Sequence, residues 1–203
     1  MRRTQADRRE EAEGRLVQAA MRLLAERGYD GFTMAEVGEA AGYSRGLPAH
    51  YFGRKDDLLA LVAKHTVDTY NAAVARIPST EPGLPRIAAL IRRYVRGGTS
   101  PGARALGMLV AEAMIRPSLK ETIDRLNDRG LEGIRRELEA GMAAGNVRPD
   151  ADIVIQARLI FSFLRGQLYF AALDPGFESE KVGEEFIVTL ESRLAVGRDP
   201  KPG

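Results

Sequence analysis

Cysteine and tryptophan are absent from this chain of 203 residues, and histidine occurs only twice. Without cysteine, disulfides and thiolate metal sites are both excluded. The absence of cysteine does not by itself identify the cellular compartment. No stretch reaches about 18 uncharged apolar residues, the length needed to cross a membrane. Residues 1–15 are highly charged and contain no apolar signal-peptide segment. We therefore expect a cytoplasmic protein that makes no use of a membrane.

Catalytic patterns are also missing. The two histidines, His50 and His65, lie in different segments, and no glycine-rich phosphate loop or H-E-x-x-H motif occurs. This leaves no cluster for nucleophilic, metal or nucleotide chemistry. The sequence predicts that the protein is not an enzyme and holds no metal or cofactor.

The net charge is only +2, but basic residues are unevenly distributed. No acid occurs between Glu39 and Asp56, whereas Arg45, Arg54 and Lys55 lie within that stretch. A charge run of this kind is often only a solvated surface, but it also suits a nucleic-acid contact. The segment is therefore a candidate for contact with DNA.

Apolar residues recur at three- and four-residue spacing and never alternate, which predicts an all-α protein. A first amphipathic helix covers about 12–24 and ends at Gly28. Thr33 has the features of an N-cap, with Glu36 as its capping-box partner. Gly42 then ends a short second helix.

Ser44 is placed to cap a third helix that runs to about Phe52. Two short helices joined by a glycine-containing turn form a helix-turn-helix. We therefore predict a three-helix DNA-binding domain over 1–55, a helical domain over 56–197 and a disordered tail over 198–203. The helices expected in the second domain cover 56–75, 85–96, 103–116, 118–144, 151–172 and 179–195.

A recognition helix places its first side chains against base edges, so Ser44 is expected among the DNA-binding residues and the residues after it are the expected readers. Arg45 can form two hydrogen bonds to one guanine. Leu47 can contact a thymine methyl group, and Gly46 permits close approach of the backbone.

Four further residues are expected at the DNA backbone or at the edge of the groove. His50 and Tyr51 follow one turn after the base readers. Thr33 and Lys55 lie at helix starts, where backbone N–H groups favour phosphate. Tyr51 could instead be a packing residue, as we expect for Phe52.

The segment Thr33–Phe52, followed by Gly53–Leu58, resembles the DNA-binding region of TetR-family regulators. The likeness includes Ser44-x-Gly46, the pair Tyr51-Phe52, and Lys55-acid-acid-Leu58. The later segments Gly145–Asp150 and Leu173–Phe177 also look like that family's second domain. The resemblance implies a homodimeric repressor that binds a palindromic operator in double-stranded DNA and is released by a small-molecule effector.

Two departures from the family pattern affect the recognition helix and the helix after it. Pro48-Ala49 stands where a bulky aliphatic residue and a tyrosine are usual, and Arg54 replaces a polar N-cap. With Ser44 as the cap, Pro48 distorts the first turn. The alternative function is a helical small-molecule sensor that has lost or altered DNA binding.

The segment 151–172 is apolar nearly all round, so it must be covered on more than one side. We expect a two-fold dimer in which this helix and 179–195 form a four-helix interface. The residues expected in that interface are Phe161, Leu164, Leu168, Phe186 and Leu190. A polar stripe along the same helix is expected to be an exposed edge or to make intersubunit hydrogen bonds, rather than to bind ligand; it consists of Arg158, Ser162, Arg165 and Tyr169.

The effector is expected to be largely apolar, since Met108 suits a pliable pocket. Glu112 could fix a cationic or hydroxylated group, but the favoured alternative is that Met108 belongs to the core and Glu112 is paired in a salt bridge. The family resemblance places the pocket among the helices at 56–75, 85–96, 103–116 and 118–144. It thereby adds His65, Tyr94 and Leu126, with an interior role for His65 as the alternative.

Overall fold

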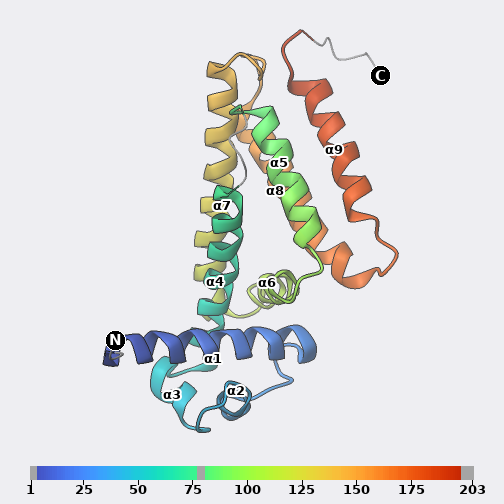
Figure 1. Ribbon diagram of the computed structural model, residues 1–203. Helices are drawn as coiled ribbons and strands as arrows, with labels where there is room; N and C mark the ends of the chain where they lie inside the picture. The colour runs from blue at the N-terminus through green and yellow to red at the C-terminus, as the bar shows by residue number, and fades with distance from the viewer. Residues whose placement is uncertain (1–3, 77–80, 198–203) are drawn as a thin grey trace. The chain divides into compact units, whose positions relative to one another are not determined.

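The computed structural model describes residues 4–76 and 81–197, and the regular elements in these ranges are α-helices (Figure 1). The predicted all-α class is confirmed, and the tail predicted at 198–203 lies outside the described residues. Among the described residues, no helix has the length and apolarity needed to cross a bilayer. The helices are α1 Gln5–Arg27, α2 Met34–Ala40, α3 Leu47–Phe52, α4 Lys55–Ala75, α5 Leu84–Gly97, α6 Pro101–Glu112, α7 Pro117–Ala143, α8 Ile153–Leu173 and α9 Ser179–Leu194.

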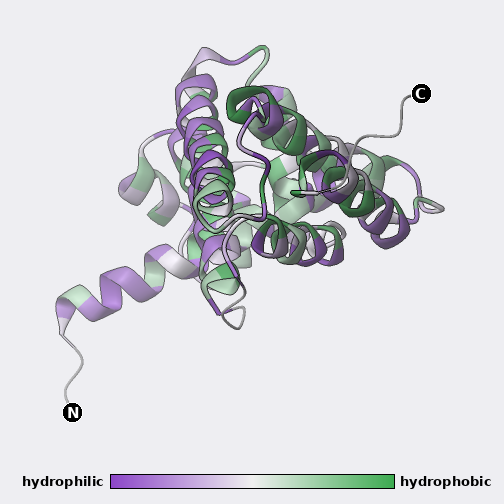
Figure 2. Cartoon of the chain, turned by 90° about the horizontal axis from the view of Figure 1, so that it is seen from above, coloured by the Kyte–Doolittle hydropathy of each residue, from purple (hydrophilic) through white to green (hydrophobic). Residues whose placement is uncertain are grey.

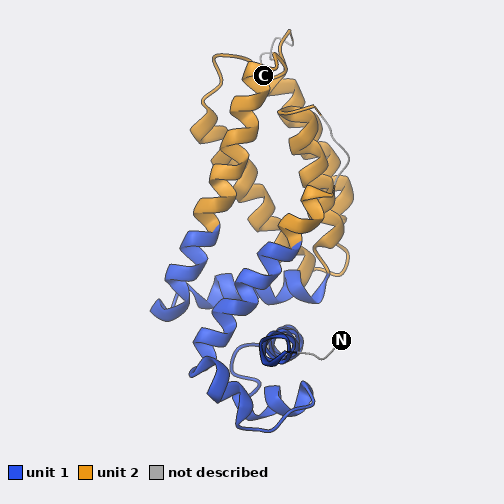
Figure 3. Cartoon of the chain, turned by 60° about the vertical axis from the view of Figure 1, so that its left-hand side comes forward, with its two compact units in different colours: residues 1–69, 100–126 blue, residues 70–99, 127–203 orange. Residues whose placement is uncertain are grey.

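The chain divides into two compact units (Figure 3). Unit 1 comprises residues 1–69 and 100–126, and unit 2 comprises 70–99 and 127–203. Helices α4 and α7 each contribute to both units, so neither unit is one continuous stretch of chain. The domain boundary predicted after residue 55 divides the DNA-binding helices from the ligand-binding helices by expected function rather than by packing. This boundary stays a prediction.

Helix α1 begins and ends at local signals. Thr4 and Asp7 form a capping box, and Gly28 ends the helix with a φ of 74°, a conformation that glycine adopts without strain. The first turns are mainly hydrophilic (Figure 2). Further along, one face is buried, including Leu16 and Leu24, and α1 packs against α2 and α6.

Helix α2 confirms the predicted start. The Glu36 N–H donates to the Thr33 hydroxyl over 3.3 Å, and the Thr33 N–H donates back to the Glu36 carboxylate over 2.7 Å. Phe32 and Val37, on either side of this cap, are both buried. Gly42, at φ 79°, lies in the turn that follows, as predicted.

Helix α3 begins later than predicted, at Leu47, and Ser44 does not cap it. The residue at the N-cap position is Gly46, and the Leu47 N–H donates to the Ser44 carbonyl over 3.1 Å, so residues 44–47 form a turn. Pro48 explains the shift, because its ring and missing N–H are tolerated only in the first turn of a helix. Pro48 therefore begins α3 rather than distorting it, and its side chain is buried.

Helix α6 is shorter than the predicted 103–116, because it ends at Glu112. Met114 and Ile115 lie in the turn that follows and are 76% and 75% exposed. Pro117 disfavours helical geometry in the residue before it, which explains the break. These two apolar side chains are therefore surface residues of unit 1.

Unit 2 has its core between α5, α8 and α9, with the later part of α7. Leu84, Ile87, Ile91, Ile160 and Ile187 are among the residues buried there. α5 packs along α9, and Val95 closes on Gly183, where an added Cβ would lie 3.1 Å from a Val95 methyl group. The close approach of these helices gives unit 2 a continuous apolar interior.

Candidate nucleic-acid interface

The turn between α2 and α3 presents the predicted base readers to solvent. The Arg45 side chain is 74% exposed, and its Nε lies 3.4 Å from the Glu39 carboxylate, which is also exposed. Ser44 and Gly46 are exposed as well, while Leu47 is half-buried. An exposed ion pair of this kind contributes little to stability, so Arg45 can exchange Glu39 for another partner.

Close packing holds this turn in place. A Cβ on Gly38 would lie 2.4 Å from the Ser44 carbonyl oxygen and 3.2 Å from Pro48 Cδ. Only glycine fits at this position without displacing the turn. Gly38 and Pro48 therefore fix where Arg45 emerges from the surface.

The end of α3 carries the second group of predicted contacts. His50 is exposed, while Tyr51 and Phe52 are both half-buried. The Arg9 guanidinium of α1 lies 5.6 Å from the centre of the Tyr51 ring. This contact places a cation of α1 beside the end of α3.

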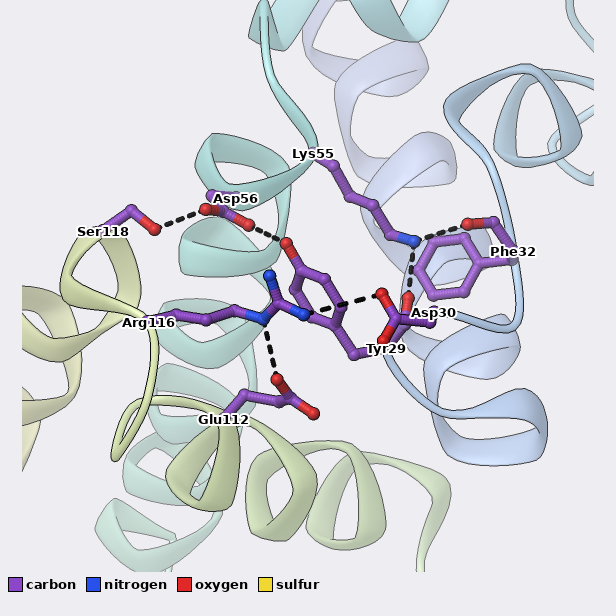
Figure 4. Close-up of polar contacts among 8 residues, drawn as sticks. All are labelled: Tyr29, Asp30, Phe32, Lys55, Asp56, Glu112, Arg116 and Ser118. Carbon is purple, nitrogen blue, oxygen red and sulfur yellow. Dashed lines mark hydrogen bonds and ion pairs between the residues drawn. The ribbon is translucent and has the colours of Figure 1, made fainter.

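Lys55 points into unit 1 rather than outward (Figure 4). Its ammonium group donates to the backbone carbonyls of Tyr29 and Phe32, and it lies 3.9 Å from the centre of the Phe32 ring. Burial lowers the pKa of Lys55. This internal engagement argues against a direct phosphate contact by Lys55 in the observed conformation, and the sequence pattern gave no sign of it.

Next to Lys55, the Asp56 carboxylate accepts hydrogen bonds from the hydroxyls of Tyr29 and Ser118 (Figure 4). Burial acts to raise the pKa of Asp56, but these two hydrogen bonds and nearby arginines hold it below its usual value. Burial, together with the bond to Asp56, raises the pKa of Tyr29 to about 12. The start of α7 is thus joined to the start of α4 and to the loop after α1.

Arg116 makes a second connection to the same loop. Its guanidinium lies 3.6 Å from the centre of the Tyr29 ring and 3.5 Å from the Asp30 carboxylate. Its Nε also donates to Glu112 over 2.8 Å. We call Tyr29, Asp56, Arg116 and Ser118 the corner network. Sequence reasoning missed it, because its members come from segments far apart in the chain and share no motif.

The predicted ligand residues are divided between the two units. His65 hydrogen-bonds Gln18 over 2.7 Å and borders an open hollow of about 400 Å³ between α1 and α4. Glu112 is paired with Arg116, as in the alternative weighed above, while Leu126 is buried and Met108 is half-buried. These four residues belong to unit 1, whereas Tyr94 belongs to unit 2 and packs edge-on against Tyr70. Their roles in ligand binding stay a prediction.

The predicted dimer residues are distributed between core and surface. Leu168 and Leu190 are only 3% and 5% exposed, so the single chain already buries them. Phe161, Leu164 and Phe186 are half-buried against the core of unit 2. Their place in an interface stays a prediction, and the apolar side chains that remain exposed on α8 are Val154, Ile155, Leu159, Phe170 and Leu173.

The polar stripe predicted on α8 divides into two parts. Arg158 and Ser162 are exposed, as expected. The expectation of an exposed edge is wrong for Arg165 and Tyr169, because both carry polar atoms buried inside unit 2. Periodicity alone did not distinguish the two parts, since the partners of Arg165, Asn127 of α7 and Tyr94 of α5, come from other helices.

The comparisons with known proteins agree with this geometry. The family model described as bacterial regulatory proteins, tetR family, matches residues 16–62. An HTH-type transcriptional regulator of Mycobacterium tuberculosis is 32% identical over 130 residues, which are 62% of this chain and 65% of that protein. The regulator HbdR of Aromatoleum sp. is 27% identical over 193 residues, 91% of this chain and 82% of HbdR. A TetR transcriptional regulator from Chloroflexus aurantiacus superposes with a TM-score of 0.81 at 20% identity, covering 93% of this chain and 98% of that one.

The fold and the exposed turn define a helix-turn-helix protein. The match to the mycobacterial regulator spans slightly less than two thirds of that protein, whereas the fold match spans nearly the whole chain. Residues 16–62 belong to the tetR family of bacterial regulatory proteins, and the relatives that the chain matches are named as transcriptional regulators rather than enzymes.

Proposed function

We propose that the protein is a ligand-responsive repressor that binds a palindromic operator as a homodimer and acts in the cytoplasm. The observation that carries the proposal is the exposed turn before α3, where Arg45 is held by a buried proline and a close-packed glycine. Arg45 and Leu47 read bases, with the Gly46 backbone close to the groove. The contacts to the DNA backbone come from Thr33, Ser44, His50 and Tyr51.

The homodimer uses the exposed face of α8. Ile155, Leu159, Ser162, Gly166 and Phe170 recur at three- and four-residue spacing and therefore share one side of the helix. Ile155, Leu159 and Phe170 are 49%, 45% and 58% exposed, and a Cβ on Gly166 would meet nothing within 4 Å. Apolar side chains flanking two small residues suit close packing against the same helix of a second copy.

Release depends on the corner network. An effector that binds one dimer geometry better than another shifts the population toward it, and only such differential affinity has this effect. Because Arg116 and Ser118 join the α6–α7 connection to Tyr29 and Asp56, a displacement of that connection reaches the helix-turn-helix. In the released geometry the two recognition helices no longer match successive major grooves.

A mobility-shift assay on the promoter upstream of the protein's own gene tests the proposal. We expect a palindromic site with half-sites about one helical turn apart and binding that weakens steeply with salt. Arg45→Ala should abolish the preference for that site, while Arg125→Ala, an exposed arginine of α7 paired with Glu121, should leave it unchanged. Equal binding by wild type and Arg45→Ala would refute the assignment of the interface.

The second candidate is a helical sensor that has lost or altered DNA binding. It is favoured by α3 itself, which spans only six residues and exposes Ala49 where a larger contact is usual in the family. This candidate predicts no retarded complex even at low salt, while small molecules still raise the melting temperature. The first candidate predicts that the molecules that raise the melting temperature also release DNA.

A further inference from the structure

Four buried polar atoms in unit 2 have no partner at full hydrogen-bond geometry among the described residues. They are the Tyr94 hydroxyl on α5 and, on α8, Arg165 Nε, Gln167 Oε1 and the Tyr169 hydroxyl. Arg165 and Tyr169 are four residues apart, so they lie on the same side of α8, whereas Gln167, two residues from each, does not face them. Burial raises the pKa of Tyr94, and the neighbouring Arg165 acts in the opposite direction through its charge and as a hydrogen-bond donor. We call Tyr94, Arg165 and Tyr169 the arginine–tyrosine site.

Arg165 has neutral neighbours at contact distance in the described part of the chain. Its Nη2 donates to the Asn127 amide oxygen over 2.5 Å, and its guanidinium lies 4.7 Å from the centre of the Phe161 ring. No carboxylate of the described residues forms an ion pair with it. An arginine stays protonated in proteins, and a buried charge without a counter-ion is costly. The cation is therefore only partly compensated by the chain itself.

The three groups of the arginine–tyrosine site can all donate, whereas Gln167 Oε1, outside the site, only accepts. The guanidinium Nε can only donate, and each tyrosine hydroxyl has a proton to donate. The arginine fork matches the two oxygens of a carboxylate. Around it, the rings of Tyr94, Tyr70 and Phe161 offer an apolar surface, with the two tyrosine rings 5.4 Å apart.

We propose that the effector is an organic carboxylate with an apolar body, and that its carboxylate accepts hydrogen bonds from Arg165, Tyr94 and Tyr169. This inference rests on the proposed ligand-responsive function and names the class of its effector. It replaces the cationic ligand considered for Glu112, because Glu112 is already paired with Arg116. The part of the effector other than its carboxylate is still expected to be largely apolar.

Matched probes test the proposal on the full chain. Phenylbutyrate and octanoate carry the carboxylate, while phenylbutyramide and octanamide have nearly the same shape without the charge. We expect the carboxylates to raise the melting temperature and to bind in calorimetry, with the amides binding at least about tenfold more weakly, as expected for the loss of one charge-assisted pair. Equal binding of acid and amide, or no binding of either acid, would overturn the proposal.

Three variants locate the site. Arg165→Met should remove carboxylate binding without lowering the melting temperature of the ligand-free protein, because it removes an unpaired buried charge. Tyr94→Phe, which leaves the ring in place, should weaken binding severalfold, and Arg158→Met, two turns earlier and exposed on α8, should have no effect. Carboxylate binding that is unchanged in both Arg165→Met and Tyr94→Phe would place the acid elsewhere and refute the site.

The outcome also separates this inference from the proposed function. Carboxylates that bind through Arg165 but leave the operator complex intact would refute only the proposed release of DNA by the effector. Neutral molecules that release DNA, with no binding of the acids, would refute only the inference that the effector is a carboxylate. A sulfonate that binds where the carboxylates do not would likewise refute the carboxylate as the recognised group.

Discussion

The hydroxyl of Ser118, at the start of α7, donates a hydrogen bond to the carboxylate of Asp56, at the start of α4. The two residues are separated by 62 positions in the chain, and Tyr29 donates to the same carboxylate. Asp56 thus ties three segments of unit 1 together at one point. This point lies directly beside Lys55 and the loop that leads into α2 (Figure 4).

Replacing Asp56 with asparagine should change how stability depends on pH. The native pKa of Asp56 is lowered, so its contribution is complete above the unfolded-state pKa of about 3.9 and is lost as pH falls through the native value. Thermal melts between pH 7 and pH 3 should therefore converge for wild type and Asp56→Asn as the solution becomes more acidic. A difference between the two that stays constant with pH would contradict the account.

Ser118→Ala should lower the free energy of unfolding by about 1 kcal/mol at neutral pH, the typical net value of one hydrogen bond.

Arg116→Ala should weaken communication between effector and operator. The variant removes the contact with the Tyr29 ring and the pairs with Glu112 and Asp30, which join α6 to the loop after α1. We expect operator affinity without effector to change little, while the effector's influence on that affinity falls about threefold or more. Arg125→Ala is the matched control, and identical effector responses in both variants would exclude the corner network as the link.

Lys55→Ala tests whether the ammonium acts inside the protein or on the DNA. Because Lys55 binds two backbone carbonyls, we expect a lower melting temperature and a slope of affinity against salt that stays unchanged. A direct phosphate contact would instead reduce that slope by about one unit with little loss of stability. Measuring the operator affinity at four salt concentrations separates the two outcomes and decides the role predicted for Lys55 from the sequence.

Gly38→Ala and Gly14→Ala form a matched pair. An added Cβ on Gly38 meets the Ser44 carbonyl oxygen at 2.4 Å, so we expect a loss of about 1–3 kcal/mol, as for other overpacked sites, together with weaker operator binding. Gly14 lies within α1, and a Cβ there meets nothing within 4 Å. Gly14→Ala should therefore stabilise the protein by about 0.5–1 kcal/mol through helix propensity. Denaturant unfolding measures the stability of both variants. If both are destabilised, the space around the added Cβ atom does not determine the effect.

Leu159→Glu should disrupt the proposed dimer. The substitution places a charge in the middle of the exposed face of α8, so we expect the dimer dissociation constant to rise about tenfold or more, or 1.4 kcal/mol. Met114→Glu introduces the same charge at an apolar residue that is 76% exposed on unit 1, and it should leave the dimer intact. Analytical ultracentrifugation distinguishes the variants, and a dimer unaffected by Leu159→Glu would exclude this face.

Local signals made much of the helical layout predictable. Thr33 with Glu36, Gly28 and Gly42 mark the ends of helices through their own caps and backbone, and each acts within a few residues of the chain. The start of α3 was misplaced because Ser44 and Pro48 are competing signals, and the proline prevails through its fixed ring. Weighing the first-turn preference of proline above the capping preference of serine would have corrected it.

The parts that sequence reasoning missed depend on distant partners. Lys55 looks like a phosphate ligand until Tyr29 and Phe32 are placed beside it, more than 20 positions earlier in the chain. Arg165 looks like an exposed stripe residue until Asn127 and Tyr94 cover it. Pairings of this kind leave no trace in periodicity, because each residue type also suits a solvated surface.

The proline at the start of α3 has a consequence for the kinetics of recognition. A helix of six residues does not persist alone in water, so a recognition element of this length would otherwise fold only on its target. Here the ring of Pro48 fixes one backbone torsion, and the burial of that ring next to Gly38 holds the other residues of the turn in place. The recognition helix and its turn are therefore already formed before they meet the duplex. The rate of association is then set by electrostatic steering and orientation rather than by coupled folding.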